Sequence, residues 1–199
     1  MHFELFGALC VFAAVTLFTP GPNNIMLMAS GLNFGFRRTL PHAAGVVLGF
    51  GFMVLLVGLG LGAVFTALTW FETVLKVVAT VYLLYLAWKI ANAGAVDAGG
   101  AKGAPMTFLQ ASAFQWVNPK AWIMAIGAIS TYATIAGFPF NSGLIALVFT
   151  ILGTASAFAW LAFGTGLRQI VSDPKSVRIF NYVMALLLVL SLIPVFLPR

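Results

Sequence analysis

Apolar stretches long enough to cross a lipid bilayer fill most of this chain, and they restrict its fold more than any other feature. A spanning helix needs about 20 apolar residues to cross a hydrocarbon core roughly 30 Å thick. Only 7% of the 199 residues are charged while 62% are apolar, whereas a soluble domain has roughly 25% charged residues. The sequence therefore predicts an all-α, polytopic membrane protein. Five stretches are long enough to span, namely residues 40–68, 71–91, 106–135, 141–167 and 177–197.

The first apolar segment is interrupted by a sequence rich in proline and glycine. Residues 5–18 and 25–34 are each too short to span alone, and Thr19-Pro20-Gly21-Pro22-Asn23-Asn24 separates them. Proline lacks an amide hydrogen and clashes with the preceding turn, so two prolines around a glycine must break a helix. Two arrangements stay open: one broken span, which we favour, or a thin span followed by a re-entrant half-helix. With the broken span, the chain has about six transmembrane helices.

A second break lies at Asn118-Pro119-Lys120, inside the stretch 106–135. Each break falls early in one half of the chain, because a linker rich in Ala and Gly separates two halves of three spans each. Three is an odd number, so the second half starts on the opposite side of the membrane and any structural repeat must be inverted. Interrupted helices at matching positions of two halves indicate a transporter binding site.

We therefore expect a single transmembrane transporter domain over residues 1–199, made of two inverted three-helix repeats with broken first helices. Repeat 1 covers about residues 1–91, the linker covers residues 92–105, and repeat 2 covers about residues 106–199.

The distribution of basic residues predicts the orientation in the membrane, because cytoplasmic loops carry an excess of Lys and Arg. With six spans, one side has Lys76 and Arg199, and we expect it to face outward together with both termini. The other side, with the linker, is expected in the cytoplasm. Because the charges are dispersed between apolar runs, the net charge of +6 does not indicate nucleic-acid binding. The basic residues of the cytoplasmic side are Arg37, Arg38, Lys89, Lys102, Arg168, Lys175 and Arg178.

The first break predicts a binding site for a zwitterion. Backbone groups left unpaired in lipid cost several kcal/mol each, so a break must be buried in protein or line a wet cavity. Pro22 suits the first turn of the second half-helix, whose free amides and partial positive charge favour a carboxylate. An ammonium group would bind the carbonyl end of the first half-helix and the oxygens of Thr19, Asn23 or Asn24. The alternative is a plain turn between two helices at the membrane surface.

Two basic side chains within the spans need a separate explanation. Lys120 is one of them, because placing a lysine at mid-membrane costs about 2.5–3.5 kcal/mol on insertion scales. A substrate carboxylate or a water-filled cavity would compensate this cost. Alternatively, the Lys120 side chain extends to the membrane interface. A histidine ring can titrate near neutral pH, so His42 is the candidate for carrying a coupled proton, with Lys120 a less favoured one. The alternative for His42 is a helix-end histidine that faces headgroups.

Other features indicate structure rather than chemistry. Glu72 and Lys76 are four residues apart and can form an ion pair, and the single cysteine, Cys10, is expected to pack within a helix. With two histidines and four acidic residues, almost no metal, cofactor or catalytic site can be assembled, so we expect no enzyme. The glycines expected to allow close helix packing are Gly45, Gly49, Gly58, Gly60 and Gly62.

The motifs resemble those of a known family. Thr19-Pro20-Gly21-Pro22-Asn23-Asn24, followed by Gly35-Phe36-Arg37, looks like the signature of the LysE/RhtB amino-acid exporter superfamily. Asn118-Pro119-Lys120-Ala121-Trp122 resembles its second conserved block, and Ala87-Trp88-Lys89 before the linker is also similar. The resemblance covers nearly the whole chain. It implies export of amino acids or their derivatives across the bacterial inner membrane, driven by the proton gradient.

Within the superfamily, the chain looks closest to the branch that exports homoserine, threonine, cysteine and O-acetylserine. Its four acidic residues fall near ends or loops, which argues against a substrate with a second cation. A passive channel or a non-transporting membrane protein is the alternative function. The glycine-rich helix faces can pack within the chain or between two chains, so a homodimer is also possible. The residues expected to bind substrate are Thr19, Pro20, Gly21, Pro22, Asn23, Asn24, Asn118, Pro119 and Lys120.

Overall fold

The computed structural model describes residues 3–93, 103–171 and 173–196. The regular elements of this part of the chain are all helical, which confirms the predicted class. In chain order they are α1 (Phe3–Phe18), α2 (Pro22–Phe34), α3 (Phe36–Leu56), the π-helical turn η1 (Val57–Leu61), α4 (Gly62–Ala67), α5 (Thr69–Ala91), α6 (Phe108–Gln115), α7 (Pro119–Thr131), the 3-10 turn η2 (Ala133–Ile135), α8 (Phe140–Ile170), α9 (Pro174–Leu190) and α10 (Ile193–Phe196).

Three helices of the described residues are long and apolar enough to cross a membrane by themselves: Phe36–Leu61, Trp70–Ala91 and Phe140–Ile170. α1 and α2 pass the same test together, with a bend of 52° at the first break. The other two expected spans are shorter or more interrupted, since α6 has 8 residues, α7 has 13 and α9 has 17. Three or four apolar spans are therefore present, and six spans in inverted repeats stay a prediction.

Local sequence explains where the short helices of the second half begin. Thr107 and Gln110 form a capping box at the start of α6, because each side chain accepts a hydrogen bond from the backbone amide of the other. Asn118 caps α7 by accepting from the Lys120 amide at 3.1 Å, and Pro119 takes the first helical position. Each cap starts a new helix, which is why this expected span is divided into two pieces.

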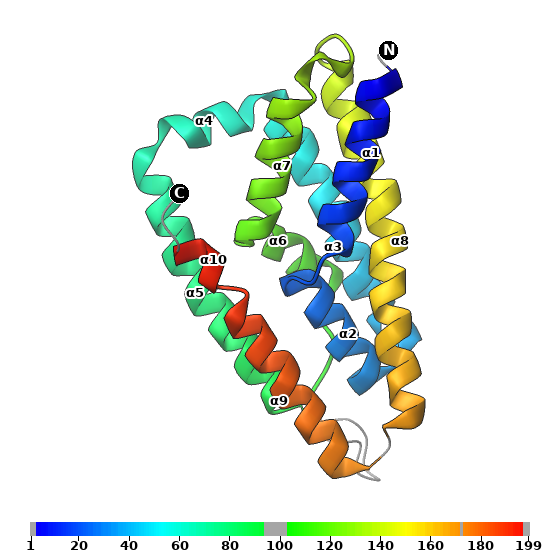
Figure 1. The fold of residues 1–199 in the computed structure, drawn as a ribbon. Helices are drawn as coiled ribbons and strands as arrows, with labels where there is room; N and C mark the ends of the chain where they lie inside the picture. The colour runs from blue at the N-terminus through cyan, green and yellow to red at the C-terminus, as the bar shows by residue number, and fades with distance from the viewer. Residues whose placement is uncertain (1–2, 94–102, 172, 197–199) are drawn as a thin grey trace.

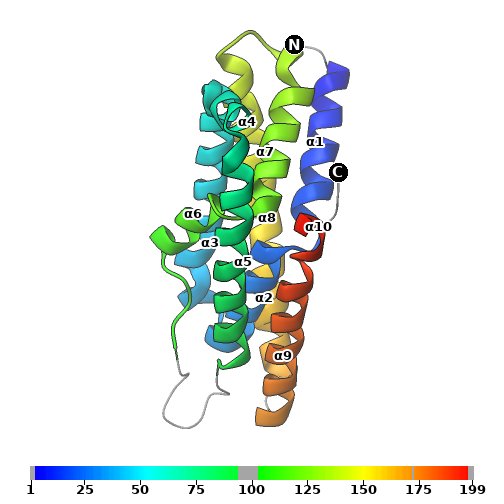
Figure 2. The same ribbon diagram turned by 90° about the vertical axis from the view of Figure 1, so that its left-hand side faces the viewer.

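The helices α2, α3, α6 and α8 form the centre of the molecule. α8 packs against α1, α2 and α3, and α3 also packs on α6. α5 and α9 lie side by side as an antiparallel pair on one flank and contact the centre mainly through α2 (Figures 1 and 2). α1 leads into α2 beside α8, and the two breaks lie at a similar height in the bundle (Figure 1).

Small residues allow the central helices to approach closely. A Cβ atom on Gly45 would overlap the Phe108 carbonyl of α6, and one on Gly49 would lie 2.6 Å from Ser112 Cα. The Ser112 hydroxyl donates to the Gly45 carbonyl at 3.1 Å, so the packing predicted for this pair of glycines is confirmed. The same prediction is wrong for Gly60, where a Cβ atom would meet none of the described residues within 4 Å and φ is 121°. Its backbone bends the chain between α3 and α4, a conformation that glycine adopts without strain.

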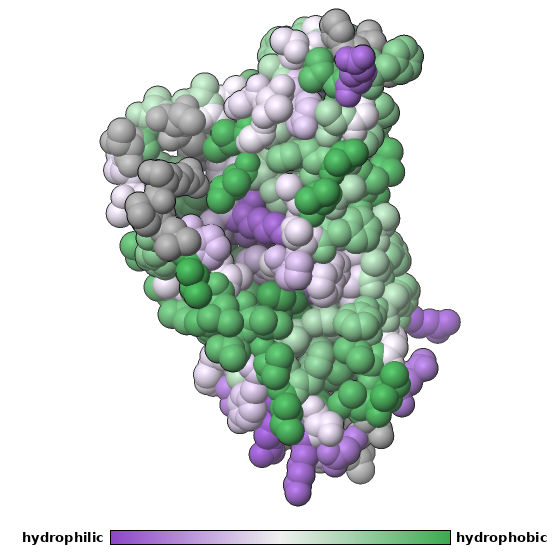
Figure 3. Space-filling model, in the orientation of Figure 1, coloured by the Kyte–Doolittle hydropathy of each residue, from purple (hydrophilic) through white to green (hydrophobic). Residues whose placement is uncertain are grey.

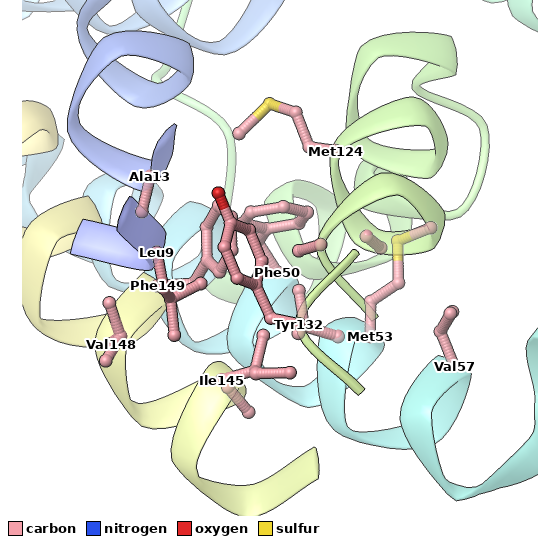
Figure 4. Packing of buried hydrophobic residues seen from close by; sticks show 14 of the residues in the cluster. Leu9, Ala13, Phe50, Met53, Val57, Met124, Tyr132, Ile145, Val148 and Phe149 are labelled. Carbon is pink, nitrogen blue, oxygen red and sulfur yellow. The ribbon is translucent and has the colours of Figure 1, made fainter. Parts of the chain in front are cut away.

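Apolar side chains fill the space between α1, α3, α7 and α8. The rings of Phe50 and Phe149 meet edge to face there, with centroids 5.6 Å apart. Many large apolar side chains are exposed on the outer surface. On the face shown in Figure 3, hydrophilic residues gather at the lower end and in a hollow at mid-height. A bundle that is apolar outside as well as inside is typical of a protein in lipid. The core residues drawn in Figure 4 include Leu9, Ala13, Phe50, Met53, Val57, Met124, Tyr132, Ile145, Val148 and Phe149.

Two smaller predictions are also confirmed. Glu72 and Lys76 form an ion pair on α5, with Oε1 and Nζ 3.0 Å apart. Cys10 is half-buried on α1 and packs against the apolar core. Both residues of the ion pair are exposed, so the pair contributes little to stability.

We predict that Gly164→Ala destabilises the bundle while Gly166→Ala on the same helix does not. A Cβ atom at position 164 would overlap the Met28 carbonyl of α2, whereas one at position 166 meets nothing within 4 Å. Overpacking typically costs about 1–3 kcal/mol, and alanine otherwise favours a helix. Thermal unfolding in detergent should therefore occur at a lower temperature for Gly164→Ala only. Equal unfolding temperatures for the two variants would contradict the close α2–α8 contact.

Candidate functional site

The two breaks meet at the carbonyl end of α1. Lys120, in the first turn of α7, donates from Nζ to the Thr19 carbonyl at 2.9 Å and to the Thr19 hydroxyl at 3.0 Å. The Pro20 carbonyl accepts at 3.4 Å. These contacts join residues 100 or 101 positions apart in the sequence. The ammonium group of Lys120 thus binds the oxygens of the first break.

A pair of amide side chains joins the breaks a second time. Asn23 Nδ2 donates to Gln115 Oε1 at 2.9 Å, and Gln115 Nε2 donates to Asn23 Oδ1 at 3.1 Å. Gln115 is fully buried in the last turn of α6, and its Nε2 also donates to the Ala111 carbonyl at 2.9 Å. The reciprocal bond therefore fixes the first turn of α2 against the end of α6.

Further donors satisfy the last carbonyls of α1. Asn24 Nδ2 donates to the Leu17 carbonyl at 2.8 Å and to the Thr19 carbonyl at 2.9 Å. The Ser156 hydroxyl of α8 donates to the Leu17 carbonyl at 2.8 Å. The final carbonyls of a helix have no partner within the helix, and unsatisfied groups are costly in lipid. Side chains from α2, α7 and α8 thus converge on this one helix end.

The amide end of α2 lies at the same place. Gly21 is its extended N-cap residue and makes no side-chain cap, and Pro22 takes the first helical position. The first amides of a helix lack intrahelical acceptors and favour an anion. A Cβ atom on Gly21 would lie 2.8 Å from Lys120 Cδ, so the lysine stem passes directly beside this helix end.

A cavity of about 40 Å³ lies between these groups. It has room for a few waters, since one water needs about 10–15 Å³ on this measure. An amino acid has more heavy atoms than these waters, so its binding requires the cavity to widen. None of the described lining residues is acidic. The polar lining comes from Thr16, Asn23, Asn24, Asn118, Lys120 and Ser156, and the apolar lining includes Val46, Val47, Phe50, Met124 and Phe149.

His42 is not brought to this cavity. Its side chain is 1% exposed, and its Nδ1 lies 3.3 Å from the Ser30 hydroxyl. It lines a separate, larger cavity of about 290 Å³ between α2, α3 and α5. A histidine enclosed in this way does not face headgroups, so that alternative interpretation of His42 is wrong.

The nine predicted site residues have different structural roles. Thr19 and Pro20 supply oxygens, Asn23 and Asn24 supply amide groups, and Lys120 supplies the cation. Gly21, Pro22, Asn118 and Pro119 instead shape the starts of α2 and α7. Ser156 and Thr16 were missed by the sequence reasoning. Their signal is weak, since each is a single small polar residue within an apolar run.

Half-helices whose free ends meet inside a bundle of apolar helices are typical of a membrane transporter. Residues 14–192 match the family described as LysE type translocator. The chain belongs to this family, which confirms the resemblance of its motifs.

Curated relatives cover nearly the whole chain. The "Cysteine/O-acetylserine efflux protein" of Salmonella choleraesuis (strain SC-B67) is 30% identical over 201 residues, which span 96% of this chain and 97% of that protein. The protein of the same name from Escherichia coli (strain K12) is 28% identical over 200 residues, with the same coverage of 96% and 97%. No solved structure matches the chain.

We predict that Asn23 and Gln115 are energetically coupled. Truncating either one leaves the amide of the other, fully buried at Gln115 and half-buried at Asn23, without this partner, and an unsatisfied buried group costs about 1–3 kcal/mol. In a double-mutant cycle of Asn23→Ala and Gln115→Ala, the double variant should therefore be more stable than the sum of the single effects implies. Unfolding free energies in mixed detergent micelles measure this. Additive single effects would show that the reciprocal bond does not hold α2 to α6.

Proposed function

We propose that the protein exports small neutral amino acids or their derivatives, of the threonine, homoserine and cysteine type, using the proton gradient. The observation that carries the proposal is the ammonium group of Lys120 bound to the carbonyl end of α1. A helix end that already binds the primary ammonium of a lysine supports binding of a substrate ammonium at the same oxygens. The names of the curated relatives, which refer to cysteine and O-acetylserine efflux, support the same substrate class.

The site fits both charges of a zwitterion. When the cavity widens, the substrate ammonium can replace Nζ of Lys120 at the Thr19 and Pro20 oxygens. The released lysine and the free amides of α2 then face the substrate carboxylate, and a charge-assisted hydrogen bond of this kind is worth about 1.5–3 kcal/mol. Because no described lining residue is acidic, a second cation on the substrate would have no partner. This favours neutral over basic amino acids.

The arrangement in the membrane is part of the proposal. Six spans in two inverted repeats, over residues 1–91 and 106–199, place the two breaks at matching positions beside one cavity. The hydrophilic lower end seen in Figure 3 is assigned to the cytoplasm of a bacterial inner membrane, with the linker 92–105 on that side and both termini outside. Most of the linker and both chain ends fall beyond the described residues.

His42 is proposed to carry the coupled proton. It is a buried titratable ring, and Lys89 is the charged residue among the described residues that line its cavity. A membrane potential of 100 mV is worth about 2.3 kcal/mol per charge, so one proton per substrate could sustain a gradient of about fiftyfold.

An uptake assay in inverted vesicles tests the proposal. Vesicles that contain the protein should accumulate labelled cysteine, O-acetylserine, threonine or homoserine with saturation, and an uncoupler should abolish the accumulation. His42→Ala should leave only downhill movement that no longer responds to the pH gradient. Uptake that neither saturates nor responds to the uncoupler would indicate a passive channel, and full pH-dependent transport by His42→Ala would remove the coupling role from this residue.

We predict that Lys120→Met lowers the kcat/KM of uptake by about ten- to a hundredfold, because one charge-assisted contact to the carboxylate is lost. Lys76→Met is the matched control, since Lys76 pairs with Glu72 on the exposed face of α5 and should transport normally. Initial uptake rates are compared at equal amounts of inserted protein. If Lys120→Met transports at the rate of the unmodified protein, Lys120 does not meet the substrate.

A further inference from the structure

A second cavity, of about 290 Å³, lies between α2, α3, α5 and the segment that precedes α6. It is near the lower limit of small-molecule pockets, which hold roughly 300–1,000 Å³. A small amino acid therefore fits it without the widening that the cavity at the breaks requires. Much of its wall is apolar, formed by Met26, Ala29, Phe34, Leu86, Ile90 and Met106.

His42 provides an unused polar group at this cavity. Its ring is 1% exposed, and Nε2 has no hydrogen-bond partner among the described residues. Buried polar side-chain atoms are otherwise paired in most proteins, so an unpaired one needs an explanation. When Nδ1 accepts from the Ser30 hydroxyl, Nε2 carries the ring proton and is a donor. The unpaired atom is then suited to an oxygen of a ligand, and because Nε2 has almost no accessible surface, a small movement of the ring must bring it to the cavity.

The charges around the cavity favour an anion. Lys89, at the end of α5, is the charged residue among the described lining residues, and none of them is acidic. Asn33 does not compete for a ligand. Its Nδ2 donates to Asn181 Oδ1 at 2.7 Å and to the Ala29 carbonyl, and its Oδ1 accepts from Asn181 at 3.0 Å. Asn33 is thus a fixed part of the wall. His42 and Lys89 are left for the ligand, and Lys89 must move its Nζ from its place over the Tyr85 ring, 5.8 Å from the centroid, to meet it.

We propose that this cavity is a second substrate site, which binds the carboxylate of a small amino acid on the cytoplasmic side before the substrate reaches the breaks. His42 Nε2 donates to the carboxylate, Lys89 attracts it, and the apolar wall contacts the side chain. The assignment of the cavity to the loading side rests on the proposed direction of export, whereas the binding of a carboxylate does not.

Cysteine protection tests this site directly. The chain has one cysteine, so Cys10→Ala provides a background in which Met106→Cys places a single thiol in the cavity wall. In inverted vesicles, saturating O-acetylserine should slow alkylation of this thiol by N-ethylmaleimide at least about fivefold. O-acetylserine methyl ester, which lacks the carboxylate, should not. Lys175→Cys, in the first turn of α9 and outside this cavity, is the control thiol and should react at the same rate throughout.

Two substitutions of His42 separate ligand binding from proton transfer. Glutamine keeps a donor near the position of Nε2 but does not titrate, so His42→Gln should keep the protection and lose the response of transport to the pH gradient. Leucine has a similar size without a donor, so His42→Leu should lose both. Equal protection in His42→Leu, or protection by the methyl ester, would overturn the proposed carboxylate contact.

Transport of O-acetylserine is measured in vesicles of the Cys10→Ala parent protein, in which Met106 is unchanged. Protection without transport would keep the second site and reject the proposed export of this substrate. Absence of protection rejects the site, whether transport occurs or not.

Discussion

A helix that ends inside an apolar bundle must satisfy its last carbonyl groups without bulk water, and this requirement organises the centre of the structure. α1 ends at the proline-glycine sequence, and its last carbonyls accept hydrogen bonds from Asn24, Lys120 and Ser156. These three residues belong to three different helices. The local break in one helix therefore determines where α2, α7 and α8 present their polar side chains.

The same constraint gives the centre its charge. The carbonyl end of a helix carries a partial negative charge, and Lys120 places a full positive charge against it. Because no acidic side chain lines the cavity among the described residues, the balance around it is positive. A bound carboxylate would improve this balance, so the electrostatics of the cavity agree with the type of molecule proposed to cross the protein.

Proline and glycine made the breaks predictable, because their effect on the backbone is local. The capping box of Thr107 and Gln110 is a local signal as well. The partners across the breaks were not predictable in this way. Gln115 binds a residue 92 positions away and Ser156 one 139 positions away, so only the packed fold brings them together. The cavity beside His42 likewise exists only once α2, α3 and α5 are assembled.

The close contact of Met28 with Gly164 ties α2 to α8, and that of Phe108 with Gly45 ties α6 to α3. At such contacts one helix backbone packs directly on the other, so the two helices cannot shift past each other without repacking. α1 and α7 meet through side chains instead: a Cβ atom on Gly127 of α7 would lie 3.8 Å from the Phe12 ring of α1, and the tip of Lys120 reaches the break. A lysine tip can detach and re-form its bonds without repacking. The widening that the proposed substrate site requires would therefore be easiest at the break, where the bonds from Lys120 to Thr19 and Pro20 can part while the α2–α8 and α6–α3 contacts stay packed.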